Sequence, residues 1–130
     1  MNKDLVYVCS PLGAPTEDGI KRNMQKAREY VKNISERCNC RAIAPHSFLP
    51  KYLDDSVPAE RELGLKFGLD LIKLCKKMYV CGDVISNGMR KEIELARSLD
   101  IPIVRWGAES KSRVTITVIE IEGESLDMYI

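Results

Sequence analysis

Short, almost wholly apolar runs alternate along this chain with longer segments in which apolar residues recur every three or four positions. The four clearest runs lie near residues 4–9, 41–44, 78–82 and 102–105. Runs this short and apolar are typical of parallel strands that helices cover on both faces. The pattern predicts an α/β fold with a doubly wound parallel sheet, flavodoxin-like or Rossmann-like, and helices on both sides.

Helical periodicity marks the segments between these runs. One helix is expected to begin after the capping residues at 16–18 and to end between residues 33 and 39, and another to run from Ser86 or Asn87 to Asp100. The apolar stripe of the first consists of Ile20, Met24, Ala27, Val31 and Ile34. Polar and charged residues fill the opposite side of each helix, as expected for amphipathic helices that cover a sheet.

A further helix is predicted over residues 58–77, with Leu63, Phe67, Leu71 and Leu74 on one face. Gly64 and Gly68 lie inside it one turn apart, and each glycine costs a helix about 1 kcal/mol relative to alanine. Such a pair indicates a close approach by another backbone, another subunit or a ligand.

The strongly β-branched run at residues 114–121 predicts a C-terminal β extension, which residues 126–130 could pair with. Such a strand would be a poor exposed edge, so we expect it to extend the sheet or to form a subunit contact. A homo-oligomer, a dimer or larger, is therefore expected.

Length and composition exclude several classes of protein. A chain of 130 residues predicts one domain, residues 1–130, and a net charge of +1 gives no reason to expect a nucleic-acid or membrane partner. Five cysteines, a single histidine and no secretory signal favour the cytoplasm and argue against a metal site. No phosphate loop, dinucleotide fingerprint or Ser-His-Asp triad is present, and no cofactor is expected.

One acidic residue breaks the helical pattern of the segment after Ser86. On a helical wheel Glu92 falls among Met89, Ile93 and Ala96, on the arc that should be buried. It also lies in the first turn, where the helix dipole favours an ionised carboxylate. A partly dry carboxylate at the start of a helix is a candidate nucleophile or ribose ligand, and the alternative is a structural acid paired with a nearby cation.

Three loops should meet at the carboxyl ends of the predicted strands, where such sheets bind ligands: residues 10–15, 45–50 and 82–88. They contain the only histidine, His46, which either contacts a ligand or caps its loop. A carboxylate there could attack or stabilise a sugar C1′ during glycosidic bond cleavage. Ser86 and the helix start could hold an anion such as a 5′-phosphate.

Several motifs resemble the nucleoside 2-deoxyribosyltransferase-like superfamily over about residues 4–106, and most closely a small, mostly uncharacterised branch found in bacteria and phages. They are Tyr7-Val8-Cys9-Ser10-Pro11, the segment 44–50, and Ser86-x-Gly88-Met89-x-x-Glu92. The resemblance implies that Glu92 is the catalytic nucleophile. It implies a ligand-binding set of Tyr7, Ser10, Pro11, Asn23, His46, Gly82, Ser86, Gly88 and Met89.

The chain departs from the family pattern at some positions. Arg90 and Glu94 replace two glycines of the helix motif, and an aspartate that assists the leaving base in the transferases falls at Gly68, with Asp70 two residues out of register.

Three hypotheses follow for a nucleoside or nucleotide ligand. The protein cleaves or transfers at an N-glycosidic bond, or it binds without turnover, for example as a phage protein that sequesters a nucleotide-derived immune signal, or its pocket is vestigial.

Overall fold

The computed structural model describes residues 3–106, which form an alternating series of strands and helices. The predicted strands at residues 114–121 and 126–130 lie outside the described residues. The elements are β1 (Leu5–Cys9), α1 (Glu17–Cys38), β2 (Arg41–Ile43), α2 (Pro58–Ile72), β3 (Lys77–Cys81), α3 (Asn87–Ser98) and β4 (Ile103–Trp106). Two short 3₁₀ turns, η1 (Pro45–Ser47) and η2 (Leu49–Lys51), lie between β2 and α2. All four strands in this range lie within one or two residues of their predicted positions.

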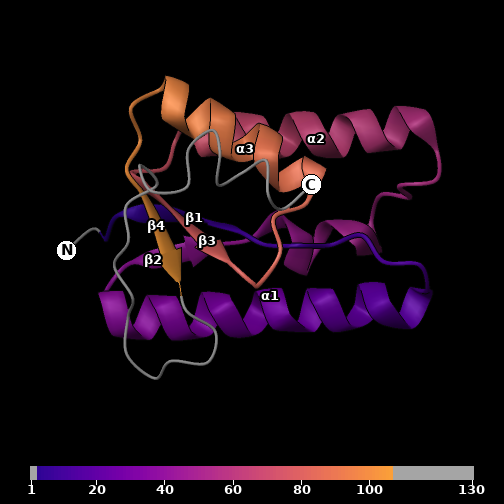
Figure 1. The fold of residues 1–130 in the computed structure, drawn as a ribbon, viewed down its shortest axis with the longest axis horizontal. Coiled ribbons are helices and arrows are strands. Elements are labelled where there is room, and N and C mark those ends of the chain that lie inside the picture. The colour runs from indigo at the N-terminus through magenta and orange to yellow at the C-terminus, as the bar shows by residue number, and fades with distance from the viewer. Residues whose placement is uncertain (1–2, 107–130) are drawn as a thin grey trace.

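The four strands form one parallel sheet in the order β2-β1-β3-β4. Helix α1 covers one face, and α2 and α3 cover the other (Figure 1). This is the predicted doubly wound, flavodoxin-like α/β arrangement. The chain moves outward from β1 to β2 and then crosses to β3 on the other side of β1. The switch point therefore lies between β1 and β3, where such folds bind ligands.

Strand β1 separates two layers of core because its successive side chains point to opposite faces. Tyr7 and Cys9 pack with α3 and Ile72, whereas Val6 and Val8 pack with Ala27 and Ile34 of α1. Cys9 and Cys81, which lie in β1 and β3, are fully buried.

Local sequence explains where two of the helices begin and end. The Thr16 hydroxyl accepts a hydrogen bond from the Gly19 amide at the start of α1, and Asn39 ends that helix in the left-handed conformation. The Ser86 hydroxyl accepts from the Met89 amide at the start of α3. Asp100 adopts positive φ two residues after Ser98. Helix α1 therefore has the predicted limits, whereas α3 begins as predicted and ends at Ser98, two residues before Asp100.

Helix α2 differs from its prediction. It ends at Ile72 rather than at residue 77, because the Lys76 amide donates to the carbonyl of Leu5 and draws the chain into the sheet. Its predicted apolar stripe packs only in part, since Leu63 and Phe67 are 57% and 43% exposed. Leu71 packs against the core, and Leu74 lies beyond the end of the helix. The helix instead buries Gly68 and Ile72.

Candidate functional site

A pocket of about 300 Å³ opens beyond the carboxyl ends of β1 and β3. The loop after β1, the connection between β2 and α2, the inner side of α2 and the start of α3 form its walls. Five residues of the predicted site line this pocket together, namely Tyr7, His46, Ser86, Gly88 and Glu92. The pocket therefore lies at the switch point of the sheet.

Glu92 is the acidic side chain that the fold buries most deeply among the described residues, with 6% of its surface exposed. It reaches this position because Met89, Ile93 and Ala96, on the same arc of α3, are packed against the sheet. Because α3 begins at Asn87, Glu92 lies in the second turn of the helix and not in the first turn as predicted. Burial raises the pKa of the Glu92 carboxyl, and the His46 ring and the Tyr7 hydroxyl oppose that rise.

The two carboxylate oxygens of Glu92 have different surroundings. The Tyr7 hydroxyl donates a hydrogen bond of 2.8 Å to Oε2. Oε1 is buried and accepts no hydrogen bond from the residues that the structure describes. A buried acceptor without a donor costs about 1–3 kcal/mol. Buried polar groups that lack a partner are often found where the group has a functional role. Glu92 is therefore the main candidate for a reactive residue in this pocket.

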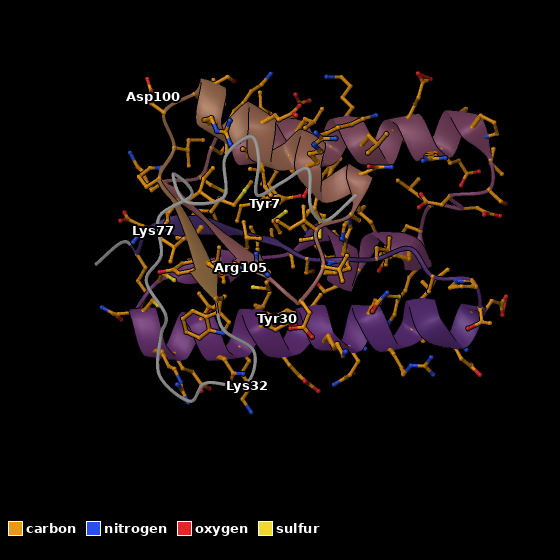
Figure 2. The ribbon with its side chains drawn as sticks, in the orientation of Figure 1. Tyr7, Tyr30, Lys32, Lys77, Asp100 and Arg105 are labelled. Carbon is orange, nitrogen blue, oxygen red and sulfur yellow. The ribbon has the colours of Figure 1, made fainter. Side chains whose placement is uncertain are left out.

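Tyr7, the hydrogen-bond partner of Glu92, is also buried. Its side chain lies between the sheet and the layer formed by α2 and α3 (Figure 2), and it is almost completely buried. Burial, followed by the charge of Glu92, raises the pKa of the Tyr7 phenol above its ordinary value. The phenol therefore stays protonated at physiological pH and serves as a permanent donor to Glu92.

Gly68 provides the space for this pair. A Cβ at position 68 would lie 3.1 Å from the Tyr7 hydroxyl and 3.4 Å from Glu92 Oε2. The groups that approach Gly68 are thus two side chains of the same chain, whereas the glycine pair had indicated another backbone, another subunit or a ligand. Asp70 does not line the pocket, and it pairs with Lys66 and Lys73 at 2.8 and 3.5 Å on the exposed side of α2.

The His46 ring has a defined orientation. Its Nδ1 lies 2.8 Å from the carbonyl oxygen of Ser10. A carbonyl oxygen only accepts, so Nδ1 carries the hydrogen, and Nε2 of the neutral ring is an acceptor. The ring lines the same pocket as Glu92. His46 can therefore exchange a proton with a bound molecule through Nε2 while Nδ1 anchors it.

The start of α3 adds donors to the pocket. Ser86 is the N-cap, and Asn87 and Gly88, the first two helical residues, line the pocket beside it. The amides of the first helical residues have no acceptor within the helix, and the dipole favours anions there. Arg61 of α2 lines the same pocket.

The other five predicted site residues do not line the pocket. The Asn23 amide donates to the carbonyl of Leu12 at 2.8 Å and so fixes the loop after β1. Gly82 has a φ of +98°, and a Cβ there would lie 3.1 Å from Pro11. Ser10 and Met89 are fully buried. Ser10, Pro11, Asn23, Gly82 and Met89 are thus placed to shape the site without lining it.

Several residues that line the pocket were not predicted from the sequence. Arg61 lies on α2 two turns before Gly68, and the glycine spacing could have indicated this face of the helix. Asp55 and Leu53 come from an irregular connection that carries no periodic signal. Within residues 3–106, no group of three His, Cys, Asp or Glu side chains could hold a metal ion, and no helix is long and apolar enough to cross a membrane.

Comparison with models of protein families shows which family the chain belongs to. The model of a domain of unknown function, DUF7768, matches residues 4–106. The chain belongs to the DUF7768 family. No curated protein matches this chain.

A solved structure shares the fold of this DUF7768 domain. It is a 2-deoxyribosyltransferase from the psychrotolerant bacterium Bacillus psychrosaccharolyticus, with a TM-score of 0.57 and 18% identity. The match covers 79% of this chain and 72% of that chain. At this identity the similarity establishes the fold.

Proposed function

We propose that this protein binds a nucleoside or nucleotide in the Glu92 pocket and cleaves, or transfers at, the N-glycosidic bond of that ligand. The observation that carries the proposal is the buried Glu92 carboxylate, held by Tyr7 in a pocket at the switch point of the sheet. The shared fold with a 2-deoxyribosyltransferase supports a nucleoside as the ligand.

In the proposed reaction a Glu92 carboxylate oxygen attacks C1′ of the sugar. The C1′–N bond breaks, and the base leaves with the bonding electron pair. Protonated His46 donates the proton that the leaving base requires, because its Nδ1 already donates to Ser10 and its other nitrogen is available. Water or a second base then attacks C1′, which releases the Glu92 carboxylate, and the proton lost by that nucleophile returns to His46.

The Tyr7 hydroxyl has a positioning role in this scheme. It fixes Oε2 through a bond of 2.8 Å and keeps the carboxylate in one orientation beneath the sugar. Positive charge that develops at C1′ favours the ionised carboxylate, which offsets the burial that raises the pKa of Glu92. Ser86, Asn87 and Gly88 would bind an anionic group of the ligand, such as a phosphate.

A binder without turnover is the second candidate function, and Gly68 favours it. The transferases that the sequence resembles carry an aspartate at this position to assist the base. Here a glycine lies within contact distance of Tyr7 and Glu92. A protein that sequesters a nucleotide-derived ligand needs the pocket and Glu92 as a ribose acceptor, but it needs no assistance to the leaving base.

The test measures base release from a panel of deoxynucleosides and deoxynucleotides, with Glu92→Gln as the informative variant. Glutamine keeps the shape of the side chain and removes the attacking charge. If Glu92 is the nucleophile, turnover falls by orders of magnitude while ligand binding survives. If Glu92 only binds ribose, no base is released, and the same change weakens binding by about 1–3 kcal/mol.

Glu94→Gln is the matched control on the same helix. The Glu94 side chain is exposed and lies 3.9 Å from Arg90 in a surface pair, so its loss should alter neither rate nor affinity. A defect in Glu94→Gln with a normal Glu92→Gln would refute the assignment. A thermal-shift panel in which no nucleoside or nucleotide raises the melting temperature would favour a vestigial pocket.

A further inference from the structure

A second hollow, of about 930 Å³, adjoins the Glu92 pocket. It lies between the first turns of α1 and residues 50–56, which are found at the same end of the molecule (Figure 1). Five residues line both spaces, namely Leu12, Gly13, Pro50, Leu53 and Asp55. The two hollows, named the inner lobe and the outer lobe, therefore share part of their walls.

The outer lobe offers an aromatic ring beside apolar and cationic side chains. The Tyr52 side chain is 74% exposed and lines this lobe together with Ile20 and Met24 of α1. Lys21 and Lys51 line it as well. An exposed ring next to apolar residues is a stacking surface for a nucleobase, and the two ammonium groups suit an anionic linker.

Two of the acidic residues in this lobe are already engaged. The Asp54 carboxylate accepts hydrogen bonds from the Ser56 amide at 2.9 Å and from its hydroxyl at 2.7 Å. A Glu60 carboxylate oxygen accepts from the Asp54 amide at 2.7 Å. These bonds hold the turn at residues 54–56, which follows Tyr52. The remaining charged residues of the lobe are Glu17, Lys21, Arg28, Lys51 and Asp55.

We propose that the ligand of this protein is a dinucleotide-type molecule, with one nucleoside in the Glu92 pocket and its second base against Tyr52 in the outer lobe. This proposal rests on the proposed nucleoside site and specifies its ligand class. The inner lobe alone lies at the lower limit of small-molecule pockets, which span about 300–1,000 Å³. A covalent link makes the second contact intramolecular, so a longer ligand gains affinity from both lobes.

The test compares matched ligands by calorimetric titration, with base release followed in the same samples. The mononucleotides AMP and TMP are paired with the dinucleoside monophosphates ApA and TpT. At least one dinucleotide should bind about tenfold more tightly than its matched mononucleotide, a typical effect of stacking one base on an aromatic ring. Tyr52→Ala should abolish that advantage and leave mononucleotide affinity unchanged, whereas Tyr52→Phe, which keeps the ring, should preserve it.

Gly13→Leu tests the junction of the lobes independently of stacking. A Cβ at position 13 would meet no atom within 4 Å, so the backbone there leaves room for a side chain to begin. It should remove the dinucleotide advantage, and Gly13→Ala should largely retain it. If mononucleotides bind and neither dinucleotide binds more tightly, or if neither Tyr52→Ala nor Gly13→Leu reduces the advantage, the two-lobe ligand is wrong and the nucleoside site stands. If none of the four ligands binds, the proposed function fails as well.

Discussion

The hydrogen bond from Tyr7 to Glu92 allows a quantitative prediction about the site. Tyr7→Phe removes the hydroxyl that lies 2.8 Å from Glu92 Oε2 and leaves the ring in place. Because Oε1 has no donor among the described residues, Tyr7 is the main donor to this carboxylate, and only the weaker Cys9 thiol would remain beside it. A hydrogen bond to a charged group contributes about 1.5–3 kcal/mol, and both side chains are buried, so solvent does not screen the loss. We expect Tyr7→Phe to lower the free energy of unfolding by this amount when Glu92 is ionised.

Urea or thermal unfolding, followed by tryptophan fluorescence, measures this loss. The single tryptophan, Trp106, is buried in β4 with its ring centroid 5.7 Å from that of Tyr79, so its emission reports on the core. The expected fall in melting temperature is about 6–12 °C for a domain of this size. The loss should shrink at acidic pH, because the Tyr7 hydroxyl lowers the pKa of Glu92 and stabilises mainly the ionised form.

Two comparisons isolate the hydrogen bond from the loss of a hydroxyl in general. Tyr52→Phe removes an exposed hydroxyl and should change stability by less than about 0.5 kcal/mol. A double-mutant cycle between Tyr7→Phe and Glu92→Gln should show a coupling free energy of about 1 kcal/mol or more. If Tyr7→Phe costs no more than Tyr52→Phe, or if the coupling is zero, this hydrogen bond does not hold the carboxylate and the positioning role of Tyr7 is wrong.

Two further predictions concern pH and assembly. Burial raises the pKa of Glu92, so between the ordinary and the raised pKa the folded protein binds more protons than the unfolded chain. As pH rises across this window, wild type should therefore lose stability relative to Glu92→Gln. Parallel curves of melting temperature against pH for the two proteins would contradict the raised pKa. Light scattering at micromolar concentration should report a homo-oligomer, because Leu63 and Phe67 of α2, and Leu74 just after that helix, are exposed apolar side chains. A stable monomer would count against this prediction. Leu74→Asp should shift the oligomer toward monomer.

Much of this fold and the identity of its central acid followed from the sequence alone, because both depend on local patterns. Short apolar runs predicted the four described strands, and Thr16 and Ser86 marked helix starts through bonds to residues three positions away. The burial of Glu92 followed from helical periodicity, since the packing of Met89 and Ile93 carries every residue on that arc toward the sheet.

Contacts between distant residues decided the rest. Helix α2 ends at Ile72 because the Lys76 amide bonds to Leu5, and no local pattern encodes that pairing. The partner of Glu92 is Tyr7, which is 85 residues away in the chain, and the glycine that makes room for both lies on a third element. The orientation of His46 depends on a carbonyl 36 residues away. Periodicity shows which side of an element is buried, and the packed sheet and helices determine which side chains meet there.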